Sequence, residues 1–205
     1  MAVDVTGIAA VILAGGKGER LGGVDKAMIA FDGERLIDRA RRVVADCEPK
    51  LLGVGGNDLA IDGLRPIRDL PGDYAGPLAG VAAAVAALQH DPAGWLLSLA
   101  VDTPFFPTDF LERALPLRAD ADVILSCFGA QDYPTNALWR LEAIRSLPAD
   151  VRNGTAPHSL RRLAAGLRIA RLDYAALVAE DPFLNANTPE DLDNLRQRAT
   201  REQPR

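Results

Sequence analysis

A glycine-rich segment with three cationic side chains lies near the start of the chain and could hold a phosphate group. It reads Ile-Leu-Ala-Gly-Gly-Lys-Gly-Glu-Arg-Leu-Gly-Gly-Val-Asp-Lys over residues 12–26. Glycines let backbone N–H groups come close to a polyanion, because no side chain keeps the backbone away. Arg20 can offer a planar fork to phosphate oxygens, and Lys26 adds a compact point charge. The segment therefore predicts a site that neutralises a bound phosphate chain.

Two familiar phosphate-binding patterns do not fit these residues. The Walker pattern requires Gly, four residues and then Gly-Lys-Ser/Thr, and no register of residues 12–26 supplies it. The dinucleotide pattern Gly-x-Gly-x-x-Gly begins at Gly16 and Gly18 but meets Leu21 where a third glycine is required. The segment alone would suit a kinase, a dehydrogenase or a transferase, and the failure of both patterns favours nucleotidyl transfer.

Two aspartates follow apolar stretches and could hold a metal ion or contact a nucleotide. Asp102 comes directly after residues 95–101, and Asp69 comes after residues 66–68. In an open parallel sheet, ligands bind beyond the carboxyl ends of the strands. Mg²⁺ on one or two carboxylates suits transfer from a triphosphate, because it neutralises charge on the α-phosphate and on pyrophosphate. We therefore expect Asp102 to be a magnesium ligand; the alternative is that each aspartate serves only as a cap or turn residue.

The elements that must position these residues alternate between apolar stretches and segments with helical periodicity. Strands are predicted over residues 8–13, 50–54, 95–101 and 123–127. Helices are predicted over residues 35–47, 78–88 and 108–115, and after residue 188. We expect Thr108 and Thr188 to cap their helices and residues 201–205 to fray. The alternation predicts a mostly parallel sheet with helices on both faces.

Composition limits the class of protein. With 205 residues, 48% of them hydrophobic and 25% charged, the chain suits one α/β domain over residues 1–205. No apolar run approaches the ~20 residues of a membrane span, and a net charge of −5 argues against a nucleic-acid partner. Cys47 and Cys127 are too few for a disulfide framework, so we expect buried thiols in a cytoplasmic protein. His90 and His158 are interpreted as structural.

The glycine-rich segment resembles the opening signature of nucleotidyltransferases that activate small molecules, Leu-Ala-Gly-Gly-x-Gly-x-Arg-Leu/Met-Gly followed by a lysine. Its end, Gly-Gly-Val-Asp-Lys-Ala, is similar to the molybdenum cofactor guanylyltransferases, which join GMP from GTP to molybdopterin. Similar segments recur at residues 76–80, 101–104, 132–138 and 183–192. This resemblance implies a single-domain Rossmann-like nucleotidyltransferase, with nucleotide bound by its N-terminal part and pterin by its C-terminal part.

The resemblance implies a role for each matching position. The implied catalytic residues are Arg20, Lys26 and Asp102, and Asp102 is also the implied Mg²⁺ ligand. The implied nucleotide-binding residues are Leu13, Ala14, Gly15, Gly16, Gly18, Lys26, Asn57, Asp69, Gly80 and Asp102. The implied pterin-binding residues are Pro134, Thr135, Asn185 and Asn187.

Two asparagine positions leave alternatives open. The family usually carries an asparagine just after its second strand, whereas this chain reads Val54-Gly55-Gly56-Asn57, so that nucleotide contact is either lost or taken over by Asn57. Asn185 and Asn187 alternate as strand neighbours do, which predicts that both point to one face. There they would meet a substrate or the metal, or else satisfy loop backbone before the last helix.

We expect an enzyme in which the phosphate of bound molybdopterin attacks the α-phosphate of GTP and releases pyrophosphate. GTP and molybdopterin are the expected partners, together with proteins that assemble or carry the molybdenum cofactor. A relative that uses CTP on the same pterin and a sugar-phosphate nucleotidyltransferase are alternatives within the class, because sequence reveals base choice poorly. A non-catalytic nucleotide sensor or cofactor carrier is the alternative from another class.

Overall fold

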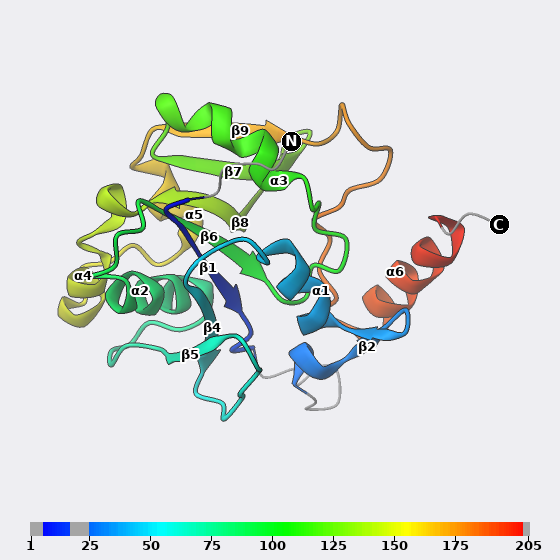
Figure 1. Cartoon of the computed structure of the whole chain (residues 1–205), viewed down its shortest axis with the longest axis horizontal. Helices are drawn as coiled ribbons and strands as arrows, with labels where there is room; N and C mark the ends of the chain where they lie inside the picture. Colours follow the sequence, from blue (N-terminus) through cyan, green and yellow to red (C-terminus); the bar gives the residue numbers. More distant parts are fainter. Residues whose placement is uncertain (1–5, 17–24, 203–205) are drawn as a thin grey trace.

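The central sheet has seven strands in the order β5-β4-β1-β6-β8-β7-β9 in the computed structural model, which describes residues 6–16 and 25–202 (Figure 1). The strands are β1 (Ile8–Leu13), β4 (Lys50–Gly55), β5 (Arg65–Arg68), β6 (Trp95–Ala100), β7 (Val123–Phe128), β8 (Gln131–Arg140) and β9 (Ile169–Asp173). Only β8 runs antiparallel to its neighbours in this sheet. β2 (Ala30–Phe31) and β3 (Glu34–Arg35) form a separate small hairpin. The predicted mostly parallel sheet is confirmed.

Helices cover both faces of this sheet, as predicted (Figure 1). One face carries α1 (Leu36–Val43), α3 (Phe110–Ala114) and α6 (Pro189–Glu202), and the other carries α2 (Pro77–Ala87), α4 (Leu147–Asn153) and α5 (Leu160–Ala165). Short 3₁₀ turns are η2 (Lys26–Met28), η3 (Leu115–Ala119) and η4 (Leu141–Ile144). Because successive strand residues point to opposite faces, Ile12 packs in the first layer and Val11 in the second.

The helix ends differ in part from the predicted ones. Thr188 caps α6 as expected: its hydroxyl accepts from the Asp191 N–H at 3.1 Å, and the Asp191 carboxylate accepts from the Thr188 N–H at 2.8 Å. Thr108 does not cap α3, which begins after Asp109 without a side-chain cap. α6 continues through Glu202. The predicted fraying of residues 201–205 is therefore wrong for residues 201 and 202, and residues 203–205 lie outside the described part.

Both cysteines are fully buried, which confirms their interpretation as core thiols. Burial raises the pKa of Cys47 to about 12 and the pKa of Cys127 to about 11, so neither forms a thiolate near neutral pH. His158 stacks on the Tyr74 ring with 5.8 Å between centroids. Within the described residues, every helix is too short or too polar to traverse a bilayer.

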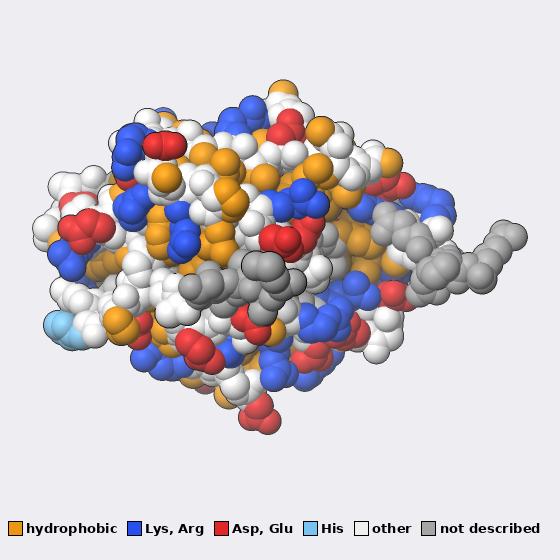
Figure 2. Space-filling model, turned by 45° about the horizontal axis from the view of Figure 1, so that its top comes forward, with side chains coloured by type: hydrophobic (Ala, Val, Ile, Leu, Met, Phe, Trp, Pro, Cys, Tyr) orange, Lys and Arg blue, Asp and Glu red, His pale blue; other side chains and the backbone are white. Residues whose placement is uncertain are grey.

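Charged side chains of both signs lie interspersed on the face of the molecule shown in Figure 2. On and beside α1, Arg35 pairs with Asp38 at 2.6 Å and Arg39 pairs with Asp32 at 3.2 Å. Exposed pairs of this kind contribute little stability, because water and salt screen them.

Asp122 joins the start of β7 to the start of β9 and makes stability depend on pH. Its carboxylate accepts from Arg168 Nη2 at 2.7 Å and from Arg168 Nε at 2.9 Å, which lowers the pKa of Asp122 from 3.8 to about 2. A pKa lowered by folding stabilises the chain above the unfolded value, and the contribution is lost as pH falls through the folded one. Asp122→Asn should therefore lower the melting temperature at pH 7 but bring it close to wild type near pH 2. Melting curves over this pH range, with the exposed Asp62→Asn as control, measure the effect; a constant difference at every pH would contradict it.

Candidate active site

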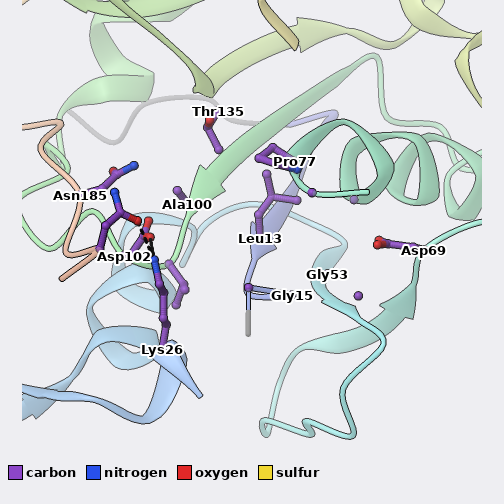
Figure 3. A pocket seen from close by; sticks show the side chains of 16 residues that line it. Leu13, Gly15, Lys26, Gly53, Asp69, Pro77, Ala100, Asp102, Thr135 and Asn185 are labelled. Carbon is purple, nitrogen blue, oxygen red and sulfur yellow. Dashed lines mark hydrogen bonds and ion pairs between the residues drawn. The ribbon is translucent and has the colours of Figure 1, made fainter. Parts of the chain in front are cut away.

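A cavity of about 250 Å³ opens at the carboxyl ends of β1, β4 and β6, the edge where open α/β sheets bind ligands (Figure 3). Its walls also include the first turn of α2, a residue of β8 and the segment before α6. The lining residues are Leu13, Gly15, Gly16, Lys26, Gly53, Gly55, Asp69, Gly76, Pro77, Gly80, Ala100, Val101, Asp102, Thr135, Asn185 and Asn187.

An ion pair between Lys26 and Asp102 stands on one wall of the cavity (Figure 3). The Lys26 Nζ lies 2.6 Å from Asp102 Oδ2 and also donates to Asn187 Oδ1 at 2.7 Å. The two charged side chains are only 14% and 13% exposed. Because they are largely shielded from water, their attraction is stronger than that of a surface pair.

A short turn holds Lys26 in place at the start of η2. The Asp25 carboxylate accepts from the Ala27 N–H at 3.0 Å, and the Ile29 N–H donates to the Lys26 carbonyl at 3.2 Å. Further along, Arg196 of α6 donates to the Ala30 carbonyl at 2.9 Å. The lysine is therefore positioned by its own turn, and β2, which follows that turn, is joined to the last helix.

Asp102 is fixed at the end of β6 by the segment that leads into α6. Its carbonyl accepts from the Ala186 N–H at 2.9 Å, between the two predicted asparagines. Asn185 Oδ1 accepts from the Thr103 hydroxyl at 2.9 Å, and Asn187 Oδ1 accepts from Lys26. Both asparagines line the cavity, as their spacing predicts, although the segment is not a strand.

Two glycines at the cavity meet where β1 and β4 end side by side. A Cβ on Gly15 would lie 2.8 Å from the Gly55 nitrogen, and a Cβ on Gly55 would lie 3.1 Å from the Gly15 Cα. Gly55 also has φ +59°, a conformation that side chains disfavour. Asn57 does not line the cavity, and its N–H donates to the Val54 carbonyl. The cavity wall at the end of β4 is therefore backbone at Gly55, and Asn57 does not take over a contact there.

Gly15→Ala should destabilise the chain, because the new methyl group would collide with backbone atoms that cannot rotate away. Such overpacking costs about 1–3 kcal/mol of unfolding free energy. Urea denaturation measures the loss. Gly56→Ala is the matched control in the adjoining loop, since a Cβ there meets nothing within 4 Å. An equal effect of both changes would contradict this account of the contact.

Most predicted site residues that the structure describes come together in this cavity. Those that line it are Leu13, Gly15, Gly16, Lys26, Asp69, Gly80, Asp102, Thr135, Asn185 and Asn187. Ala14 is buried beside it and donates to the Gly53 carbonyl at 2.8 Å, and Pro134 adjoins Thr135 on β8 without lining the cavity. Gly18 and Arg20, the latter a predicted catalytic residue, lie outside the described residues.

Several lining residues were not predicted, because they contribute backbone or apolar surface. They are Gly53, Gly55, Gly76, Pro77, Ala100 and Val101. Glycines inside the strand 50–55 are a signal for close backbone approach, and they could have been found on that ground. Gly76 and Pro77 belong to the segment 76–80 that carries the resemblance, but only Gly80 of that segment is among the implied site residues.

The carboxylates of the cavity are suited to a metal ion that is shared with a phosphate ligand. Burial raises the pKa of Asp69, and Asp102 already pairs with a cation, Lys26, at 2.6 Å. Asp102 Oδ1 has no hydrogen bond to any described residue. No cluster of three or more His, Cys, Asp or Glu side chains in residues 6–16 and 25–202 could cage a metal. Mg²⁺ fits such a site, because it binds through one or two carboxylates and completes its shell with waters and phosphates.

Comparison with known proteins agrees with this geometry. The model of the MobA-like NTP transferase domain matches residues 10–170. The chain is 34% identical to the molybdenum cofactor guanylyltransferase of Bradyrhizobium sp. (strain ORS 278), over 91% of both chains. It is 36% identical to the molybdenum cofactor guanylyltransferase of Rhodobacter capsulatus, over 94% of this chain and 98% of the relative.

A solved structure shares the fold at lower identity. Molybdopterin-guanine dinucleotide biosynthesis protein A from Archaeoglobus fulgidus superposes with a TM-score of 0.72 and 23% identity, over 95% of this chain and 99% of the other. The sequence relatives cover nearly the full length of the chain, and the cavity is lined by Lys26, Asp102, Asn185 and Asn187 of the segments that carry the resemblance. The chain therefore belongs to the family of MobA-like NTP transferases, and its similarity to the molybdenum cofactor guanylyltransferases is confirmed.

Proposed function

We propose that this protein transfers GMP from GTP to molybdopterin and releases pyrophosphate. The observation that carries the proposal is the joining of Lys26, Asp102 and Asn187 on one wall of a cavity that the glycine backbone after β1 also lines. A cationic side chain and bare backbone N–H groups bind a triphosphate directly, and a carboxylate binds it through Mg²⁺. The names of the relatives supply the base and the acceptor.

In the proposed reaction, an oxygen of the molybdopterin phosphate attacks the α-phosphorus of GTP. One P–O bond forms, the bond from the α-phosphorus to the bridging oxygen of the β-phosphate breaks, and pyrophosphate leaves with that electron pair. The attacking phosphate is already an anion at neutral pH, so no side chain has to remove a proton. The protein therefore contributes mainly orientation and charge neutralisation.

Each wall of the cavity has a part in this proposal. Backbone N–H groups of Gly15 and Gly16 would hold phosphate oxygens, and Lys26 would neutralise the charge that develops on them. Asp69 and the first turn of α2 at Gly80 would contact the nucleoside. Thr135, Asn185 and Asn187 would receive the pterin substrate, with Pro134 alongside. Gly18 and Arg20 would extend the phosphate site beyond the described residues.

Asp102 would hold Mg²⁺ in this site. When bound, the ion neutralises charge on the α-phosphate and on the departing pyrophosphate. The support is chemical: a carboxylate with one oxygen unused by described residues lines the same cavity as the phosphate-holding backbone. We also propose that the reaction occurs in the cytoplasm, which the two free cysteines favour.

A pyrophosphate-release assay tests the proposal. GTP, CTP, ATP and UTP are each incubated with the protein and Mg²⁺, with and without molybdopterin, and we expect release only with GTP and molybdopterin together. Preference for CTP would identify a cytidylyltransferase. Release with a sugar phosphate in place of molybdopterin would identify a sugar-phosphate nucleotidyltransferase. Nucleotide binding without release under every condition would identify a sensor or carrier, and each of these three results would overturn the proposal.

A further inference from the structure

A row of three hydrogen bonds leads from the backbone of β6 to the cavity. The Ala100 N–H donates to Asn136 Oδ1 at 2.9 Å, Asn136 Nδ2 donates to the Thr103 hydroxyl at 3.2 Å, and that hydroxyl donates to Asn185 Oδ1 at 2.9 Å. Asn136 is 1% exposed and Thr103 is 5% exposed. Neither of these two residues lines the cavity. The polar atoms of Asn136 and Thr103 are therefore used inside the protein, and Asn185 is the side chain of the row that lines the cavity.

An irregularity in β8 places Asn136 at this position. Leu125 of β7 pairs with Ala137, but the next residue, Ser126, pairs with Tyr133, so residues 134–136 bulge out of the ladder. Pairing of β8 with β6 also stops at Ala137. The Asn136 side chain then takes the Ala100 N–H that a regular β8 would have paired.

The backbone N–H at the start of the row determines which atom donates and which accepts in each of the three hydrogen bonds. A backbone N–H can only donate, so Asn136 must accept with its carbonyl oxygen and donate with its NH₂ group. The Thr103 hydroxyl accepts that bond, and among the described residues its own hydrogen has Asn185 as its acceptor. Asn185 must therefore use its carbonyl oxygen here, which leaves its NH₂ group for the cavity.

Asn187 is oriented in the same way by a different partner. The Lys26 ammonium group has three donors and no acceptor, so Asn187 receives it with Oδ1. No hydrogen bond among the described residues uses Nδ2 of Asn185 or of Asn187. The two amides therefore both have N–H donors for a ligand, on either side of the Asp102 backbone carbonyl that binds Ala186.

We infer that Asn136 and Thr103 are positioning residues, which hold the Asn185 amide with its NH₂ group toward the acceptor substrate. The group that this arrangement receives is one with acceptor oxygens only, which describes an ionised phosphate. The carbonyl oxygen of each asparagine accepts one hydrogen bond from the protein, so the groups directed at a ligand are the NH₂ donors, which bind substrate oxygens. This inference rests on the proposed function in one respect, namely that the phosphate belongs to molybdopterin.

Thr103→Val and Thr103→Ser form the first test, since valine has nearly the same shape without the hydroxyl and serine keeps it. In Thr103→Val, the Asn185 side-chain amide can flip and exchange its oxygen and nitrogen. We therefore expect the KM for molybdopterin to rise about tenfold, the effect of one misdirected hydrogen bond. The KM for GTP should stay within about twofold. Thr103→Ser should restore the wild-type KM for molybdopterin.

Asn136→Asp is a second test, and its readout does not depend on activity. A carboxylate at this position accepts from both the Ala100 N–H and the Thr103 hydroxyl. The hydrogen bond between Thr103 and Asn185 then reverses its direction, and the Asn185 NH₂ group must donate to the Thr103 oxygen. In two-dimensional ¹H–¹⁵N NMR spectra, the Asn185 side-chain NH₂ signal should exchange rapidly with water in the wild type. The same exchange should be slow in Asn136→Asp. Thermal melting establishes whether Asn136→Asp folds. If it does not fold, the comparison of Thr103→Val with Thr103→Ser tests the inference.

The outcomes separate the inference from the proposed function. Wild-type KM values in Thr103→Val would overturn the inference. An equal loss of kcat and of affinity for both substrates in Thr103→Val and Thr103→Ser would show a general structural role, and it would overturn the inference too. If the wild-type protein releases no pyrophosphate with molybdopterin, the proposed function fails. The exchange rates in Asn136→Asp then still decide the orientation of Asn185.

Discussion

Lys26→Ala is expected to remove nearly all turnover while leaving the protein folded. Removal of one preorganised electrostatic contact to a reacting group typically costs about 10²–10³-fold in rate. Lys26 is such a contact in our proposal, and its Nζ lies within 2.7 Å of both Asp102 and Asn187. The initial rate of pyrophosphate release at saturating GTP and molybdopterin measures the effect. Circular dichroism and thermal melting test whether the fold is retained.

Lys50→Ala is the matched control for this change. Lys50 is the first residue of β4, so it lies at the opposite end of the strand from the cavity. Its ammonium group donates to the carbonyls of Ala45 and Cys47 at 3.2 and 3.1 Å, so the change removes one positive charge and comparable contacts. We expect normal turnover in Lys50→Ala. Full activity in Lys26→Ala would be incompatible with the assigned role of this lysine.

Asp102→Asn is expected to have the second large effect. The amide keeps the shape of the side chain but lacks the charge that would hold Mg²⁺. Metal neutralisation of transition-state charge contributes several kcal/mol, which corresponds to a loss of about 10²–10³-fold in kcat. A titration of turnover with Mg²⁺ should reach a plateau in the wild type and stay near background in the variant. A plateau at the wild-type rate and the same Mg²⁺ concentration would exclude Asp102 as the ligand.

Asp91→Asn is the control, because Asp91 and Asp102 flank the same strand. Asp91 precedes β6, and its Oδ1 accepts from the Ala93 N–H at 3.0 Å. An asparagine can accept that bond with its own carbonyl oxygen. The change therefore removes the same charge at the other end of β6, and we expect wild-type turnover and Mg²⁺ dependence.

The strands that the sequence predicts best are those buried on both faces. β1 is a continuous apolar run and β6 is apolar except for Ser98, as expected of parallel strands between two helix layers. β8 was not predicted, because it contains Pro134 and polar residues where it bulges. β9 was missed as well, since it is a short strand at the edge of the sheet in which exposed and half-buried residues alternate.

In the candidate site too, some residues could be predicted from local sequence and others could not. Lys26 and Asp102 could be predicted because their chemistry is unusual beside glycines and at a strand end. Asn136 could not be singled out, because its importance depends on which strand lies beside β8 and where their pairing stops. The role of Gly55 against Gly15 likewise depends on how two distant strand ends approach each other. Contacts of this kind are tertiary, and local sequence patterns do not contain them.

The separation of the site residues along the chain has a consequence for synthesis on the ribosome. The Lys26 to Asn187 hydrogen bond joins residues 161 positions apart, and the Arg196 to Ala30 bond joins residues 166 positions apart. The phosphate-holding end of the cavity is made early in translation, whereas Asn187 is made 161 residues after Lys26. A polypeptide that ends before Asn185 lacks the wall that we propose receives the acceptor substrate, so we expect it to be inactive.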